Sequence, residues 1–323
     1  MICSLKDKEF EIIKFSNKLY LISVVPPIVG FEEFICIWLY KGEKKFIIDV
    51  GPAVTSSFLI NALKKLEVNR LDYICLTHIH MDHAGGIGEI AEYYKDTPII
   101  CHRDGISHLV DPERLVKGSI KILGETGRIY GPMQPVGQKR FIEADKFTSE
   151  LIHPIITPGH SSHHVSYLVE NYIFAGEAGG VFLSPVPGKK YLRPATPPRF
   201  FMEIYINSLD KLIKSKADII CYGHFGMAKG AVELLKQHRE QMFLWHNIIS
   251  TRFSESKSDD YIENLTKQLL ETDSLLECFH QLKEEVKERE KKFIKNTIMG
   301  FTQFFLSNKG CMIGSTKKNT KEN

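Results

Sequence analysis

One stretch of ten residues constrains this chain more than any other. It reads Thr77-His78-Ile79-His80-Met81-Asp82-His83-Ala84-Gly85-Gly86 and directly follows the apolar run Tyr73-Ile74-Cys75-Leu76. Three imidazoles and one carboxylate fall within six residues, a density of metal ligands that ordinary surface composition does not produce. The spacing His-x-His-x-Asp-His suits a strand end that becomes a loop and then a helix, where alternate side chains reach two adjacent points. We therefore predict a site for two metal ions rather than one tetrahedral structural site.

The composition of the chain limits its partners and its compartment. The 323 residues include 42 basic and 39 acidic side chains, a formal net charge of +3, so no strongly basic surface for nucleic acid is expected. The seven cysteines form no Cys-x-x-Cys pair, which indicates reduced thiols. The N-terminal residues lack an apolar signal core, and no uncharged run approaches the roughly 18 residues of a membrane span. These features predict a cytoplasmic protein that binds neither nucleic acid nor membrane.

The order of the apolar runs predicts an α/β fold. Strands are expected over 9–15, 19–25, 34–40, 45–50 and 97–101, helices over 56–66 and 87–94, and further strands with one helix over 201–215 between residues 141 and 222. After residue 230 the apolar spacing is helical, with helices predicted over 232–250, 260–272 and 275–305. We predict an α/β domain over 1–230, a C-terminal helical layer over 231–306 and a disordered basic tail over 307–323.

Several strand-like runs end in a residue that can bind metal. Asp49 and His78 follow early runs, and His160, Glu177 and His224 follow later ones. The ends of neighbouring strands lie together in a sheet, so residues far apart in the sequence can converge there. The irregular separations between them exclude a sequence repeat and suit loops carried by one scaffold.

Counting donors divides these residues between two metal ions. One ion would bind three imidazoles, those of His78, His80 and His160. The second ion would bind one carboxylate and two imidazoles, from Asp82, His83 and His224. Glu177 then has a place between the ions, where its charge offsets their repulsion. A water held between two such ions loses a proton near neutral pH, so hydrolysis is the expected chemistry. The ligands favour two divalent ions, zinc first, with iron or manganese as alternatives.

On these residues the chain resembles the metallo-β-lactamase-fold superfamily. The match consists of the acid after an early strand (Asp49), the His-x-His-x-Asp-His motif and the three later ligands, in order from about residue 18 to 226. The resemblance implies that residues 1–230 form a catalytic αββα sandwich with a dinuclear site at one edge between two sheets. We interpret Asp82 as a ligand that also orients the attacking water, and Asp49 and His164 as supports that orient the ligands.

One position departs from the family pattern. Most relatives have Asp in the Phe-x-Gly-Asp position, whereas this chain reads Phe174-Ala175-Gly176-Glu177. The longer acid could bridge both ions, shift to one ion or withdraw. On the sequence alone, Glu177→Asp is expected to keep both metals and most of the activity.

Within the resemblance, the chain is similar to the group of glyoxalase II, acyl-homoserine lactonases and related thioesterases. RNA-processing relatives carry a long insertion after the bridging acid, but only 47 residues separate Glu177 from His224, and a secreted lactamase would need a signal peptide. We predict hydrolysis of an ester, thioester or lactone in a small acyl substrate. Two alternatives stay open, a phosphodiesterase or nuclease on the same two ions and a non-catalytic metal-binding scaffold.

The segment from Tyr191 to Phe201 is the candidate substrate contact. Tyr191 and Phe200 could line an apolar pocket, and Arg193 or Arg199 could meet a carboxylate or phosphate. The alternative is a structural crossover with solvated arginines. The C-terminal helices would then either cover the acyl pocket or form a homodimer surface.

Overall fold

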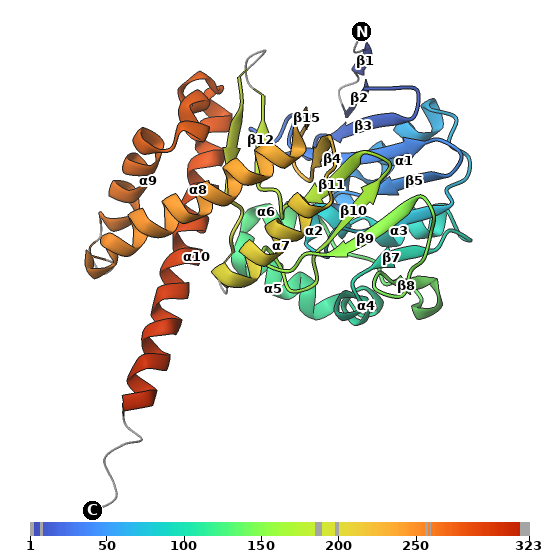
Figure 1. The fold of residues 1–323 in the computed structure, drawn as a ribbon. Helices are drawn as coiled ribbons and strands as arrows, with labels where there is room; N and C mark the ends of the chain where they lie inside the picture. The colour runs from blue at the N-terminus through green and yellow to red at the C-terminus, as the bar shows by residue number, and fades with distance from the viewer. Residues whose placement is uncertain are drawn as a thin grey trace, which may run out of the picture.

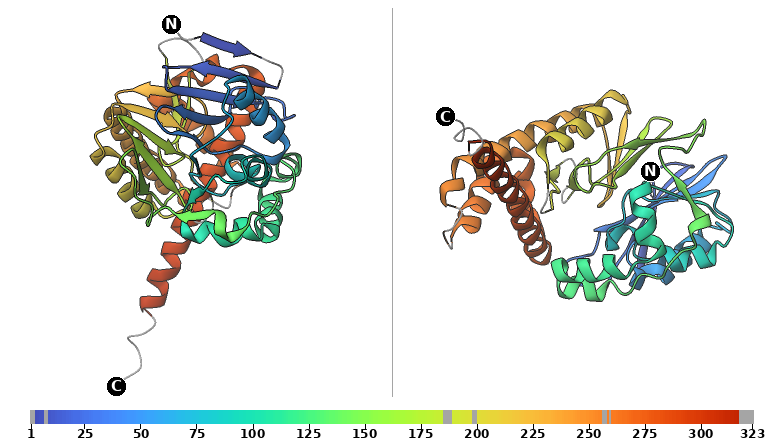
Figure 2. Two further views of the ribbon diagram at one scale, coloured as in Figure 1. Left: turned by 90° about the vertical axis from the view of Figure 1, so that its right-hand side faces the viewer. Right: turned by 90° about the horizontal axis from the view of Figure 1, so that it is seen from below.

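Two β-sheets face each other in the centre of the molecule (Figure 1). The computed structural model describes residues 3–6, 9–184, 189–197, 200–255, 258 and 260–316. Helices cover the outer face of each sheet, and further helices at the C-terminal end extend the layer over the second sheet (Figures 1 and 2). The predicted α/β sandwich with a C-terminal helical extension is confirmed.

The first sheet holds its strands in chain order: β1 (Cys3–Lys6), β2 (Phe10–Lys14), β3 (Leu19–Val24), β4 (Ile35–Lys41), β5 (Lys45–Ile48), β6 (Tyr73–Cys75), β7 (Ile99–Cys101) and β8 (Phe141–Glu143). Neighbours are antiparallel from β1 to β5 and parallel from β5 to β8. Parallel neighbours need long crossovers, and helices supply them. As a result β5 and β6 end at the same edge of the sheet, which is where Asp49 and His78 follow.

The crossover helices lie outside this sheet. They are η1 (Ala53–Thr55), α1 (Ser56–Lys65), α2 (Met81–Ala84), α3 (Ile87–Tyr93), α4 (Arg103–Val110), α5 (Glu113–Leu123), α6 (Glu125–Ile129) and η2 (Gln138–Arg140). In α1, leucine and alanine at helical spacing are buried against the sheet, whereas α5 buries none of its side chains. Of the segment after β7, only α5 lies at the surface, since α4 buries Ile106 and Leu109 in the core.

The second sheet has the order β15 (Met227–Lys229), β14 (Ile219–Tyr222), β11 (Tyr172–Gly176), β10 (Val165–Val169) and β9 (Ile152–Ile156). The pair β11 and β14 is parallel and is joined through α7 (Met202–Lys214), while the other neighbours are antiparallel. A separate hairpin of β12 (Val181–Leu183) and β13 (Tyr191–Arg193) lies between them in the sequence. The parallel pair brings the residues after β11 and β14, Glu177 and His224, to one edge.

Both faces of the first sheet are buried. In β3, Leu19 and Leu21 pack between the two sheets against Trp38 and Tyr167, while Ile22 belongs to the core beneath the outer helices. Side chains alternate across a strand, so a strand that is apolar at every position serves two cores at once. This layering is the physical basis of the helix–sheet–sheet–helix sandwich, seen from two sides in Figure 2.

The C-terminal helices share a core with the second sheet. They are α8 (Ala231–Thr251), η3 (Phe253–Glu255), α9 (Tyr261–Thr272), η4 (Ser274–Gln281) and α10 (Glu284–Thr316). Trp245, Leu269 and Ile298 belong to the same buried cluster as Ile173 and Tyr222 of the sheet. No boundary of exposed residues therefore separates the helical layer from the sandwich within the described residues.

Two sequence expectations for this layer differ from the structure. The single helix predicted over 275–305 is wrong, because Leu282 is extended, with ψ of 151°, and separates η4 from α10. Leu282 is buried, so its extended backbone turns an apolar side chain into the core. At the other end, α10 runs to Thr316 and so extends into the tail for which the sequence predicts disorder; residues 317–323 lie outside the described part.

The buried positions of the cysteines agree with reduced thiols. Cys36, Cys75, Cys101, Cys221 and Cys278 are buried and unpaired, whereas the side chains of Cys3 and Cys311 lie outside the described part. Among the described residues, the structure has no helix that combines the length and apolarity needed to cross a membrane.

Candidate metal centre

The loop after β6 carries four of the predicted ligands into one edge of the sandwich. His78 and His80 follow the strand, and His80 precedes the short helix α2, which presents Asp82 and His83 from its first turn. The turn is held by the backbone N–H of His83, which donates to the carbonyl of His80 at 3.0 Å. The change from strand to helix aims the four side chains at neighbouring points, as the sequence spacing predicts.

The first group of ligand atoms comes from His78, His80, His160 and Glu177. Nδ1 of His80 lies 3.0 Å from Nε2 of His78 and 3.0 Å from Nε2 of His160. An oxygen of Glu177 lies 2.8 Å from Nε2 of His160 and 3.3 Å from Nε2 of His78. Two ligands of a tetrahedral zinc ion stand roughly 3.3 Å apart, given bond lengths of about 2.0 Å. The donor set and its spacing fit a divalent metal ion.

The second group comes from Asp82, His83 and His224. Nε2 of His83 lies 3.3 Å from Nε2 of His224. The Oδ2 atom of Asp82 lies 3.8 Å from the His83 nitrogen and 3.6 Å from the His224 nitrogen. This set of one carboxylate and two imidazoles also fits a divalent ion.

The carboxylate of Glu177 lies between the two groups. Its Oε2 atom faces His78 and His160 and is 3.5 Å from Nε2 of His83, while its Oε1 atom is 3.5 Å from Nε2 of His224. The seven predicted ligands therefore converge, and the acid with the extra methylene reaches both groups.

Asp49 orients His83 directly and His78 through Thr77 by hydrogen bonds to the ring nitrogens that face away from the metal groups. Its carboxylate accepts the backbone N–H of Thr77 at 2.7 Å, the Thr77 hydroxyl at 2.8 Å and the Nδ1–H of His83 at 2.8 Å. Because the Thr77 hydroxyl donates to Asp49, its oxygen is free to accept Nδ1–H of His78 at 3.0 Å. These contacts fix the tautomers that turn Nε2 of His78 and His83 towards the centre. Asp49 adopts a positive φ of 63°, a strained backbone conformation for a non-glycine residue.

Backbone carbonyl groups hold the other two Nε2 ligands. Nδ1 of His160 lies 2.9 Å from the carbonyl oxygen of Ala195, and Nδ1 of His224 lies 3.3 Å from that of Phe34. The ring of Phe34 also stacks on the ring of His224, with centroids 4.1 Å apart. Phe34 and Ala195 could not be predicted from the sequence, because every residue has a carbonyl group and no residue type or spacing marks these two.

His164 supports Glu177 through its backbone. Nε2 of His164 accepts the N–H of Glu177 at 3.1 Å, so the other ring nitrogen carries the proton and donates to Thr157 Oγ1 at 2.9 Å. Burial lowers the pKa of His164, which keeps the ring in this neutral form. On the other side, the Tyr205 hydroxyl lies 3.1 Å from the carbonyl oxygen of Glu177. Tyr205 was not among the sequence candidates.

The charge states of the ligands differ. Burial opposes protonation of His83 and His160, but Asp82 and Asp49 raise the pKa of His83 well above its usual range and Glu177 raises that of His160, so a metal ion would displace a proton from these two rings. Burial lowers the pKa of His78, and burial together with His160 lowers that of His80 to about 4. Burial opposes ionisation of Glu177, but His160 and His224 outweigh it and hold the pKa of this carboxyl well below its usual range. At neutral pH His78 and His80 are neutral imidazoles and Glu177 is a carboxylate, the forms that bind metal.

The seven ligands differ in their exposure to solvent. His78, His83, His160, Glu177 and His224 are all buried. His80 is half-buried, and the Asp82 side chain is 18% exposed. His80 and Asp82 are therefore the least buried of the seven ligands.

The structure corrects the expected setting of the candidate substrate residues. Tyr191, Arg193 and Phe200 are each no more than 2% exposed, so they do not line an open pocket. Phe200 packs against Phe301 of α10, and the Arg193 guanidinium donates to a carboxylate of the same helix. The alternative of solvated arginines is wrong for Arg193, because α10 covers it. Substrate contact stays a prediction for these residues, and Arg199 lies outside the described part.

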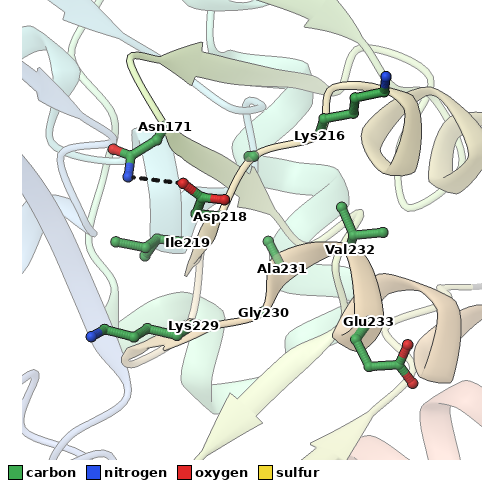
Figure 3. A pocket seen from close by; sticks show the side chains of 10 residues that line it. Asn171, Lys216, Asp218, Ile219, Lys229, Gly230, Ala231, Val232 and Glu233 are labelled. Atoms are coloured by element: carbon green, nitrogen blue, oxygen red, sulfur yellow. Dashed lines mark hydrogen bonds between the residues drawn. The ribbon is translucent and has the colours of Figure 1, made fainter.

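A surface depression lies apart from the metal centre (Figure 3). It has a volume of about 630 Å³ and is lined by residues that include Asn171, Lys216, Asp218 and Lys229. Asn171 donates to Asp218 at 3.4 Å across it. Asp218 precedes β14, whereas His224 follows that strand, so the depression lies at the opposite end of the sheet. None of the predicted ligands lines it.

The family comparison agrees with this geometry. Residues 35–224 match the model of the metallo-beta-lactamase superfamily. The metallo-beta-lactamase fold-containing protein ST1585 of Sulfurisphaera tokodaii is 28% identical over 226 residues, which cover 66% of this chain and 80% of that protein. The crystal structure of ST1585 superposes with a TM-score of 0.64 at 24% identity, covering 88% of this chain and 98% of that chain.

Two enzymes are more distant relatives. Hydroxyacylglutathione hydrolase of Buchnera aphidicola is 27% identical over 143 residues, 44% of this chain and 46% of that protein, so the chain spans less than half of its length. N-acyl homoserine lactonase of Bacillus thuringiensis is 28% identical over 174 residues, 51% of this chain and 61% of that protein.

Proposed function

This chain belongs to the metallo-beta-lactamase superfamily, and on that premise we propose that it is a metal-dependent hydrolase of a carboxylic ester, thioester or lactone. The observation that carries the proposal is the position of Glu177, whose two oxygens face the two groups of ligands. A single metal site would not need a carboxylate shared between three imidazoles on one side and two on the other.

The residues present fit two divalent ions, with zinc favoured by the imidazole-rich set. When bound, such ions supply a nucleophile from water at neutral pH and polarise the bond to be cleaved. The chain itself supplies the orientation. Asp49 and Thr77 hold His78 and His83, and backbone carbonyl groups hold His160 and His224.

Asp82 is the residue that we propose to act on the attacking water. It is the most exposed of the three carboxylates of the centre, with its side chain 18% exposed against 9% for Glu177 and 3% for Asp49. Its Oδ2 atom is 3.6 Å from Nε2 of His224, so the other carboxylate oxygen is available to accept a hydrogen bond from water. A carboxylate in that position orients the water and receives its proton.

The acyl substrate class is supported by two relatives. Their names specify a hydroxyacylglutathione and an N-acyl homoserine lactone as substrates, and both substrates are acyl compounds.

The test combines metal analysis with a substrate panel. The purified protein, loaded with zinc, iron or manganese, is assayed on thioesters, lactones, carboxylic esters and bis-p-nitrophenyl phosphate. We expect about two metal ions per chain and turnover of an acyl substrate. The variant His78→Ala should lose metal binding and turnover. The control His153→Ala, which removes an exposed histidine of β9, should keep metal binding and turnover.

The other outcomes separate the alternatives. Faster hydrolysis of the phosphate diester than of every acyl compound would show a phosphodiesterase. Less than one metal per chain with no turnover on any substrate would show a non-catalytic scaffold and refute the proposal.

A further inference from the structure

A buried cluster of charges joins α10 to two loops of the sandwich. The carboxylate of Glu290 accepts hydrogen bonds from Nε of Arg193, at the end of β13, and from Nε of Arg289, its neighbour in α10, the latter at 2.9 Å. All three side chains are buried, with Glu290 fully so. We call these three residues the charge triad. Charges this deep are costly unless they are paired, so the three side chains have to stay together.

On one side the charge triad holds the segment that orients His160. Arg193 stands two residues before Ala195, whose carbonyl oxygen lies 2.9 Å from Nδ1 of His160. A second contact from α10 secures the same segment, since the Thr297 hydroxyl donates to the carbonyl of Pro194 at 3.2 Å. The position of Ala195, and with it the ring of His160, therefore depends on α10.

On the other side the charge triad holds the loop that orients His224. Nη1 of Arg289 donates to the carbonyl of Gly30 at 2.6 Å, and its guanidinium carbon lies 4.0 Å from the centre of the Phe34 ring. Phe34 in turn stacks on His224 at 4.1 Å and offers its carbonyl oxygen to Nδ1 of that histidine. The order of contact is Arg289, Phe34, His224.

Close packing of α10 against the loop at Gly30 and against the segment at Thr196 does not depend on the charges. A Cβ atom added to Gly30 would lie 2.5 Å from the carbonyl oxygen of Glu285 in α10, and one added to Gly300 of α10 would lie 2.6 Å from the carbonyl oxygen of Thr196. A Cβ atom essentially never comes this close to a carbonyl oxygen, so each site requires glycine. The helix backbone therefore rests directly on the two loops that carry the orienting carbonyl groups.

We propose that the charge triad Arg193–Glu290–Arg289 positions one histidine in each metal group, His160 through Ala195 and His224 through Phe34. The other two Nε2 ligands, His78 and His83, are held by Asp49 and Thr77 instead, and these contacts do not involve α10. The triad residues are thus positioning residues with selective targets. This inference rests on the proposed metal centre, because it assigns the triad a role in that centre.

The experiment measures hydrogen exchange at the ring Nδ1–H groups by 15N NMR of the full chain, with and without zinc. In Glu290→Gln, exchange at His160 and His224 should be about 2- to 10-fold faster than in the wild type, as expected when a hydrogen bond of ordinary strength is weakened or lost. Exchange at His78 and His83 should not change. Zinc affinity, measured by competition with a chelator, should fall by up to about 10–100-fold, the usual effect of losing a support behind a metal ligand.

Single arms of the triad are tested separately. Arg193→Lys should affect His160 and leave His224 unchanged, while Arg289→Lys should do the reverse, because lysine keeps the charge but not the planar fork. The matched control is Glu288→Gln on the same helix, which removes an exposed partner of Lys291 and should alter none of the four histidines.

Two results would overturn the inference. Unchanged exchange at His160 and His224 in both folded lysine variants would show that the triad only stabilises α10, and equal acceleration at all four histidines would show general loosening. If Glu290→Gln does not fold, the two lysine variants decide. Failure of the proposed function is seen separately, as a wild-type protein that binds no zinc or hydrolyses nothing, and the exchange comparison still holds for the metal-free chain.

Discussion

Shortening Glu177 by one methylene tests whether its reach is what joins the two metal groups. Glu177→Asp keeps the charge but withdraws the carboxylate by about one C–C bond, 1.5 Å. The backbone cannot follow easily, because the N–H of Glu177 donates to His164 at 3.1 Å and its carbonyl oxygen accepts the N–H of Gly180 at 3.1 Å. A metal–oxygen bond of about 2.1 Å would lengthen well beyond coordination distance.

The expected result is therefore loss of a shared ligand. Removing a support behind a ligand weakens metal binding by 10–100-fold, so removal of the ligand itself should weaken the second metal by at least about 100-fold, or about 2.8 kcal/mol. Turnover should fall in parallel, since it requires both ions.

Competition with a chelator measures the two metal affinities in the wild type, in Glu177→Asp and in the matched variant Glu177→Gln, which keeps the reach but removes the charge. We expect both variants to bind the second ion weakly. Wild-type affinity for two ions and full turnover in Glu177→Asp would refute the geometric reasoning and would restore the expectation drawn from the sequence, that aspartate serves equally well here.

Three further predictions concern the residues around the centre. Asp49→Asn should weaken zinc binding by about 10–100-fold, because an amide cannot accept all the hydrogen bonds from Thr77 and His83; zinc titration showing wild-type affinity would contradict this. Gly300→Ala should destabilise the fold by about 1–3 kcal/mol through the clash with Thr196. The control Gly118→Ala, which meets nothing within 4 Å in the exposed helix α5, should stabilise the fold by up to about 1 kcal/mol. Urea unfolding measures both changes, and equal effects would refute the close contact between Gly300 and Thr196. Burial opposes ionisation of Glu290, but Arg193 and Arg289 outweigh it and lower the pKa of this carboxyl. The ionised carboxylate therefore stabilises the fold above the ordinary carboxyl pKa of about 4.5, and this stabilisation is lost as the pH falls through the lowered pKa. The difference in melting temperature between wild type and Glu290→Gln should shrink towards acid pH, and a constant difference would show that the charge of Glu290 does not matter.

The sequence determined the class of fold and the donors of the centre. Alternating and continuous apolar runs predicted the strands, because the period of a strand decides which faces are buried. The ligands were recognisable because three imidazoles and one carboxylate fall within six residues, and because strand ends of a sheet meet at one edge. His78, His80, Asp82, His83, His160, Glu177 and His224 all converge as that reasoning requires.

The tertiary structure decided how those donors are held. The supports of His160 and His224 are carbonyl groups of Ala195 and Phe34, and a carbonyl group is common to all residues, so no pattern in the sequence marks it. In the same way, the sequence leaves open whether Arg193 contacts a ligand or solvent. Only the structure shows that α10 packs against it and that Arg193 donates to Glu290. Residue chemistry can be read locally, but the partner of a buried charge depends on which distant segment folds against it.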